Sequence, residues 1–183
     1  MVTLDWLTCI ANTFQLLPET QLTIVYLFDR YLMVHRFTVD KVLLSLNYEI
    51  GEPRAIHFVR RFTKHFELGV HQLAKAICEI AAYDYNICHV KPSMIAFASV
   101  YLAAALKKIE FPEQLYTTAK FSKTKVEKLV PTLANAVVDM LKNQKQYPHI
   151  YKKMLVHREL IFSANNIAAL TAAANASRPH EEY

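Results

Sequence analysis

The sequence predicts an all-α protein built from two successive helical domains. Two glycines and seven prolines in 183 residues are too few for the many turns of a β-sandwich or barrel. Hydrophobic residues make up 53% of the chain, which is ample material for a packed core. Apolar side chains recur three to four residues apart along most of the chain, as on one face of a helix.

The first predicted domain covers residues 1–51 and opens with two helices. The apolar face of the first helix is formed by Leu4, Leu7, Ile10, Phe14 and Leu17. Pro18 and Glu19 then end that helix and begin the second, because proline is tolerated in a first turn and glutamate complements the helix dipole there. A further helix is expected at 39–48, with Thr38 as its N-cap.

The break between the domains is predicted at Gly51. This glycine fits the left-handed position after a helix, and Pro53 fits the first turn of the next one. The second predicted domain covers residues 52–160, with Gly69 as another natural helix stop. Residues 161–183 are expected to form a flexible tail.

The longest apolar run, Met94–Leu106, is predicted to be the central core helix of the second domain. A membrane-spanning helix needs ~20 apolar residues, and this run is shorter. We therefore expect no membrane partner.

Basic residues are concentrated in residues 120–158, which contain nine basic and two acidic residues. A stretch of this kind is suited to binding nucleic acid or an acidic protein partner. It also fits a solvated helix, because Lys123, Lys125 and Lys128 alternate with apolar Val126 and Leu129. Both interpretations stay open at this point.

Motifs of catalysis and cofactor binding are missing from the sequence. Neither a Gly-rich nucleotide loop nor a GxSxG or HExxH motif occurs. Cys78 and Cys88 do not pair with histidines at zinc-finger spacing, and the adjacent Cys88 and His89 rarely suit one metal. We expect no catalytic residue, no metal and no cofactor, and hence an interaction module.

Three segments, in order, carry a resemblance to the cyclin family. The segment LDWLTCIANTFQLLPETQLTIVYLFDRYLM resembles the first two helices of a cyclin box. The segment NYEIGEPRAIHFVRRF is similar to the linker between two boxes, and LAKAICEIAAYDYNICHVKPSMIAFASVYLAAALK is similar to the start of the second. The resemblance spans residues 3–158 and is closest to the mitotic A/B group. It implies two tandem cyclin-box-like domains.

The first box departs from the family pattern after Lys41. That residue is followed directly by VLLSLNYEIG, which resembles the end of the fifth helix. The third and fourth helices and most of the fifth are therefore missing, on the order of thirty residues at ~11–12 per helix.

The missing third helix is the one around which its neighbours pack. The side chains expected to lose their cover are Leu7, Ile10, Phe14, Val25 and Leu32. Exposing each costs ~1.5–3 kcal/mol, against a total stability of ~5–15 kcal/mol. The first box is thus expected to be molten, rearranged or dependent on a partner.

The resemblance implies a regulatory subunit of a cyclin-dependent serine/threonine kinase, acting at G2/M in nucleus and cytoplasm. It maps kinase contacts to Leu43, Tyr48 and Ile50, for which packing in the core or linker is the alternative. Substrates or inhibitors of the kinase are further implied partners. A remnant of the family's substrate-docking patch falls at Val2 and Trp6, and Trp6 fits a core position equally.

A second function stays open beside the kinase regulator. A nucleic-acid-binding transcription factor with the cyclin fold, of the IIB type, would use the basic residues of 120–158. Nucleic acid is the less favoured partner.

Overall fold

The computed structural model describes residues 2–34, 53–143, 145, 148–154 and 164–175. Every regular element in these ranges is helical, which confirms the predicted all-α class. None of the described helices is both long and apolar enough to cross a membrane. The predicted helix at 39–48 and the break at Gly51 lie outside the described residues.

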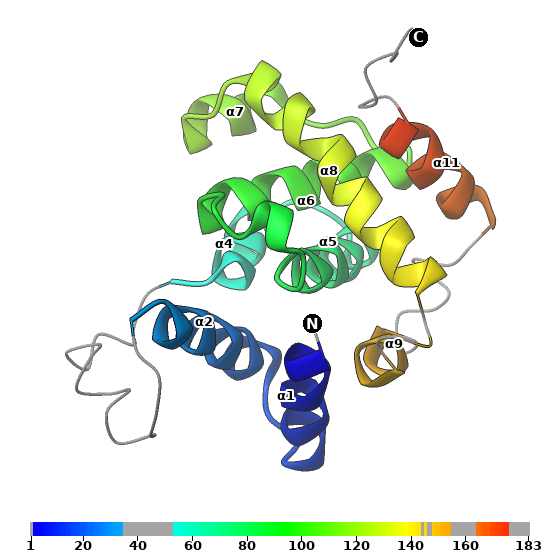
Figure 1. Cartoon of the computed structure of the whole chain (residues 1–183). Helices are drawn as coiled ribbons and strands as arrows, with labels where there is room; N and C mark the ends of the chain where they lie inside the picture. Colours follow the sequence, from blue (N-terminus) through cyan, green and yellow to red (C-terminus); the bar gives the residue numbers. More distant parts are fainter. Residues whose placement is uncertain (1, 35–52, 144, 146–147, 155–163, 176–183) are drawn as a thin grey trace, which may run out of the picture.

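The N-terminal part contains the helix pair predicted from the sequence. Helix α1 covers Val2–Thr13 and α2 covers Pro18–Val34, with the predicted break between them. Figure 1 shows the pair in the lower part of the molecule, with the short helix α9 (Pro148–Met154) beside α1 and the other helices above.

The second domain is a helical bundle around α6. Its elements are α4 (Ala55–Phe62), α5 (Leu68–Ala81), the short 3₁₀ turn η1 (Tyr85–Ile87), α6 (Pro92–Leu106), α7 (Glu113–Ala119) and α8 (Lys123–Lys142). Helix α6 packs against α4, α5 and α8, and its central residues are buried on all sides. The predicted core helix is therefore confirmed. Helix α8 continues through Pro131.

The predicted flexible tail is wrong for residues 164–175. Helix α11 (Ala164–Asn175) packs against α8 and α6, and Leu170 and Ala174 are buried in the common core. Alanine is the strongest helix former, and residues four apart share one helix face. The alanine-rich segment, whose composition suggested a loose tail, therefore forms a helix that is held in place by the burial of Leu170 in the bundle.

Gly69 does not end a helix as the sequence suggested. The preceding helix α4 ends at Phe62, and Gly69 is the second residue of α5, after the N-cap Glu67. Its φ is not positive, so nothing in its conformation requires glycine. The turn between the two helices is made by residues 63–67 instead.

Replacing Gly69 with alanine should therefore stabilise the protein by about 0.4–1 kcal/mol, because alanine reduces the entropy of the unfolded chain and favours the helix. The added Cβ would meet only the end of the Lys107 side chain, at 3.6 Å from Cε. Urea unfolding of the variant beside the parent chain measures the difference. A loss of stability would show that this first turn does not tolerate a side chain.

Candidate protein-interaction site

Helix α2 is attached to the second domain by apolar contacts. Leu22 is buried, and Val25 belongs to the same core cluster as Val59 and Phe62 of α4. The expectation that Val25 loses its cover is therefore wrong, because the second domain buries this face of α2. The helix pair therefore packs against the bundle through α2.

A buried polar network crosses the same junction. We call it the junction network; it consists of Thr8, Gln21, Glu79, Tyr83 and Lys153. Lys153 Nζ lies 2.8 Å from Glu79 Oε2 and donates to Gln21 Oε1 at 2.5 Å. The Gln21 amide nitrogen donates to the Tyr83 hydroxyl at 2.7 Å and to Thr8 Oγ1 at 3.1 Å. The network thus joins α1, α2, α5 and α9.

The pairing within the network matches the chemistry of each group. Lysine has only donors, so its contact fixes the Gln21 amide with the oxygen toward Lys153 and the nitrogen toward the hydroxyls. The Glu79 side chain is 2% exposed and that of Lys153 is 19% exposed. A carboxylate buried to this degree needs a paired cation. Burial also raises the pKa of Tyr83, so its hydroxyl keeps its proton at neutral pH.

Asp5 of α1 caps the start of α9. Its Oδ1 accepts hydrogen bonds from the backbone N–H groups of His149 at 3.0 Å and Ile150 at 3.2 Å. The first N–H groups of a helix have no partner within it, and a carboxylate satisfies them and complements the dipole. Both ends of α9 are thereby held by the N-terminal helices, through Asp5 and through Lys153.

Two arginines of the α4 region complete the junction. Arg60 forms an ion pair with Glu19 at the start of α2. The guanidinium carbon of Arg54, which is buried, lies 3.4 Å from the centre of the Tyr26 ring. A desolvated cation–π contact of this kind contributes about 2 kcal/mol. The orientation of α2 on the second domain is thus fixed by packing and by charge.

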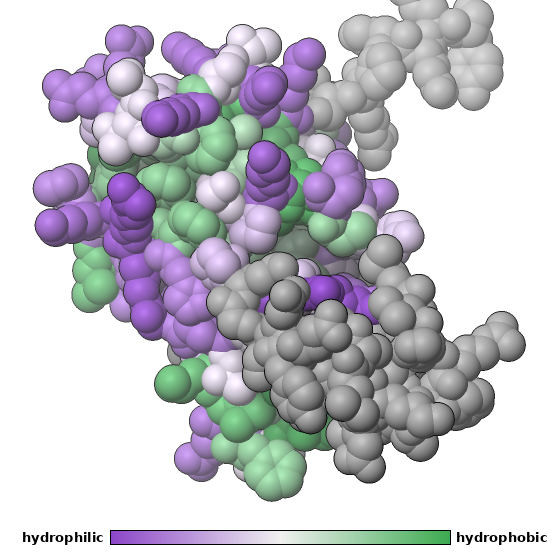
Figure 2. Space-filling model, turned by 90° about the vertical axis from the view of Figure 1, so that its left-hand side faces the viewer, coloured by the Kyte–Doolittle hydropathy of each residue, from purple (hydrophilic) through white to green (hydrophobic). Residues whose placement is uncertain are grey.

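The helix pair also exposes large apolar side chains. Trp6 is 59% exposed, Phe14 71% and Leu17 68%. Trp6 lies on α1, whereas Phe14 and Leu17 lie in the turn between α1 and α2; we call these three residues together the α1 apolar face. Figure 2 shows hydrophobic side chains at the lower end of the molecule, where the C-terminal end of α1 lies. Large exposed apolar side chains are candidates for burial against a partner, and the junction network holds α1 through Thr8.

The structure places the residues implied by the resemblance as follows. Trp6 belongs to the α1 apolar face, so the alternative of a core position is wrong. Val2 is the first residue of α1, and its side chain lies outside the described part. Leu43, Tyr48 and Ile50 also lie outside the described residues, so their role stays a prediction. Among the side chains expected to lose their cover, Phe14 is exposed, whereas Leu7 and Ile10 are half-buried.

The junction network was not predicted from the sequence. Its only local signal is that Gln21 and Glu79 are polar residues within apolar helical segments. Across the described residues, no group of histidine, cysteine or acidic side chains could hold a metal ion.

Comparisons with known proteins identify the family of the second domain. The family described as "Cyclin, C-terminal domain" matches residues 53–168, which is more than half of the chain. The match begins next to α4 and extends into α11, so it covers the whole bundle around α6.

Curated relatives with similar sequences are mitotic cyclins. The chain is 25% identical over 197 residues to the G2/mitotic-specific cyclin-B1 of Oryzias latipes, covering 81% of this chain and 48% of that protein. It is 25% identical over 202 residues to the cyclin-B2 of Bos taurus, with 83% and 50% covered. It is 27% identical over 191 residues to the cyclin-B1 of Xenopus laevis, with 79% and 48% covered. The chain therefore spans about half the length of these relatives.

Proposed function

Because the chain belongs to the cyclin family, we propose that it is a non-catalytic regulatory subunit that binds a cyclin-dependent serine/threonine kinase in mitotic cell-cycle control. The family match over residues 53–168 and the B-type relatives support this role. Activity in the nucleus and cytoplasm, and contact with the kinase's substrates or inhibitors, are parts of the same proposal.

The observation that carries the proposal is the exposed α1 apolar face on a helix pair that the junction network joins to the second box. Covering Trp6, Phe14 and Leu17 with a partner removes them from water, and each large side chain contributes ~1.5–3 kcal/mol when fully buried. The neighbouring segment supplies Leu43, Tyr48 and Ile50 as kinase contacts. Cyclins reposition the glutamate-bearing helix of the kinase and so complete its Lys–Glu ion pair.

We further propose that activation of the kinase is impaired. The aligned stretch of 197 residues with the Oryzias latipes cyclin exceeds the 183 residues of this chain, so the relative has residues with no counterpart here. This supports the reading that helices are missing from the first box after Lys41. Since those helices carry part of the kinase contact, the chain should bind a kinase and activate it weakly or not at all.

Reconstitution with a purified mitotic cyclin-dependent kinase tests both parts. Size-exclusion chromatography and calorimetry measure the complex, and phosphorylation of a peptide substrate measures activation beside a full-length B-type cyclin. We expect a complex with little or no activity. Leu43→Asp should weaken the complex at least tenfold, because a charge is brought into an apolar contact. Leu68→Asp is the matched control, because Leu68 is an exposed leucine on the second box.

The outcomes separate the two parts of the proposal. Failure to form a complex with the kinase would contradict the regulatory role, and full activation would contradict the impairment. Equal effects of Leu43→Asp and Leu68→Asp would place the contact elsewhere. The transcription-factor alternative predicts tight DNA binding that falls steeply between low and physiological salt, and the B-type relatives do not favour it.

A further inference from the structure

A groove of about 820 Å³ lies on the second box, between α4 with its following turn, the start of α6, and α7. No residue of α1 or α2 lines it, so it is separate from the α1 apolar face. Its volume falls in the range of ~300–1,000 Å³ that is usual for ligand sites. Figure 2 looks onto the side of the molecule where α4 and α7 lie, and shows hydrophilic side chains around hydrophobic ones there.

The rim of this groove carries charge of one sign. We call it the basic groove; its rim residues are Arg61, Lys64, His65, Lys91 and Lys120. All five are exposed, and none of the lining residues is acidic. Like charges around a concave surface focus the potential and attract ligands of opposite sign.

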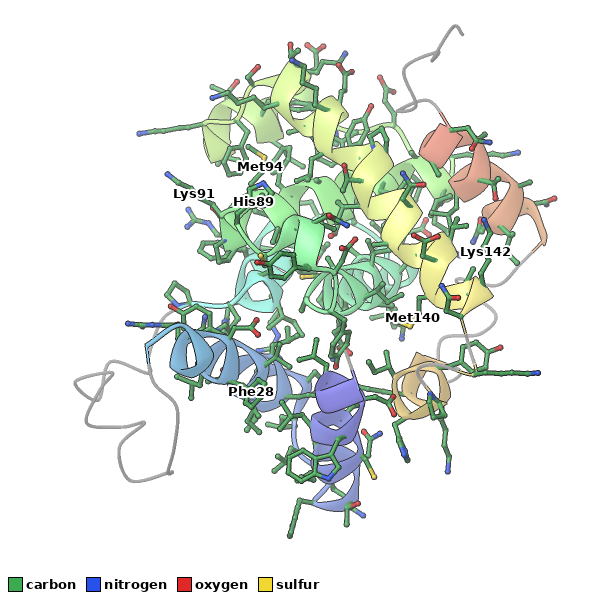
Figure 3. All side chains as sticks on the ribbon, in the orientation of Figure 1. Phe28, His89, Lys91, Met94, Met140 and Lys142 are labelled. Atoms are coloured by element: carbon green, nitrogen blue, oxygen red, sulfur yellow. The ribbon has the colours of Figure 1, made fainter. Side chains whose placement is uncertain are left out.

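The start of α6 adds to the positive potential. Lys91, the N-cap of this fifteen-residue helix, provides no side-chain hydrogen bond to the first turn, and Pro92 has no N–H group. The positive end of the helix dipole at Ser93 therefore faces the groove without a cap from the N-cap side chain. Figure 3 shows Lys91 pointing outward from this end of α6.

The turn after α7 explains how Lys120 stays on the rim. This residue adopts φ 57°, the left-handed conformation, and the next residue, Phe121, turns back toward the core, where its ring meets that of Phe97 at 5.3 Å. A bulky residue pays a conformational cost in this region. The burial of Phe121 offsets that cost.

The floor of the groove is apolar. Phe58, Phe66 and Phe121 line it as half-buried rings. Phe58 stacks on Phe62 with ring centres 6.5 Å apart, and Phe66 packs on Phe111 at 5.8 Å. Because these rings are engaged with their neighbours, the floor offers hollows for apolar side chains. Each of these contacts covers part of a ring and leaves less ring face for the stacking of nucleic-acid bases.

We propose that the basic groove binds an acidic, extended segment of a partner protein. Carboxylates of that segment pair with the rim, and its alternate apolar side chains rest on the phenylalanine floor. Charge complementarity selects the segment, and the apolar contacts hold it. The groove lies outside the first box, so this proposal can be tested independently of kinase binding.

A phage-displayed library of random peptides, selected on the whole purified chain, tests the proposal. The enriched peptides should be rich in Asp and Glu with interspersed apolar residues. Arg61→Glu/Lys64→Glu should weaken binding of a fluorescein-labelled selected peptide by about tenfold or more, since two attractive charges become repulsive. Lys123→Glu/Lys125→Glu, the same charge change on exposed positions of α8 outside the groove, should leave it within about twofold.

A steric variant tests the groove without changing its charge. Thr118 lines the groove and is exposed, so Thr118→Trp should fill the groove and abolish binding of the same peptide, while Thr124→Trp on α8 should not. Thermal unfolding checks that each variant is folded. The proposal is overturned by enriched peptides that are not acidic, by equal binding to the groove and α8 variants, or by a single-stranded oligonucleotide that binds the groove more tightly than the peptide.

Discussion

Replacing Lys153 with methionine should lower the free energy of unfolding by about 3–5 kcal/mol. The change removes the cation that lies 2.8 Å from the Glu79 carboxylate and the donor to Gln21 Oε1. Glu79 then keeps a charge that is 2% exposed and has lost its partner. Against a typical stability of ~5–15 kcal/mol, a loss of this size is large. Urea unfolding followed by circular dichroism measures it.

The double variant Glu79→Gln/Lys153→Met is the matched control. It removes both charges, so no unpaired ion stays buried, and it should recover more than half of the loss. If the double variant is as unstable as Lys153→Met alone, the ion pair is not the source of the effect. Hydrogen exchange should also show α1, α2 and α9 opening before α6, because the network lies between these helices and the bundle.

Individual helices could be predicted where their start, end and burial are marked by neighbouring residues in the sequence. The uninterrupted apolar run of α6, with Lys91 and Pro92 at its start, indicates a buried helix without any tertiary information. The break between α1 and α2 is likewise marked by Pro18 and Glu19, in adjacent positions. Each of these features depends on residues within one or two helical turns.

The junction could not be predicted for the opposite reason. Gln21, Glu79 and Lys153 meet only once α2, α5 and α9 are in place, and no spacing in the sequence relates them. The same holds for Val25, because its apolar character in the sequence does not indicate which helix covers it, and the structure packs it in the cluster that contains Val59 and Phe62. The segment around Leu170 was predicted to be a tail from its composition. It forms a helix because Leu170 packs against the bundle, a tertiary contact that the sequence does not indicate.

The candidate site was predicted only in part. The resemblance singled out Trp6, and the structure shows it exposed, as it also shows Phe14, one of the side chains that were expected to lose their cover. The basic groove was not predicted, because Arg61, Lys91 and Lys120 belong to different helices and turns. Of the described residues in the basic stretch 120–158, Lys120 is the one basic residue that lines it, while the exposed Lys123, Lys125 and Lys128 fit the solvated-helix alternative.

Replacing Phe97 with alanine should destabilise the whole chain by about 3–5 kcal/mol. Its fully buried ring meets Phe62, Phe111, Tyr116 and Phe121 edge-on, with ring centres 5.2–5.3 Å apart. Rings from four separate segments cannot collapse together into the space that one ring leaves, so a cavity persists at the centre of the bundle. Tyr85→Ala is the matched control: it deletes an exposed ring and should change stability by less than about 0.5 kcal/mol.

The manner of unfolding should distinguish the two destabilised variants. In Phe97→Ala, exchange should rise in α4, α6 and α8 and in α1 and α2 alike, because the helix pair depends on the second box for the burial of Leu22 and Val25. In Lys153→Met, only the helix pair and α9 should open early. If α1 and α2 keep their protection in Phe97→Ala, the pair is stable on its own, and the second box does not support the α1 apolar face.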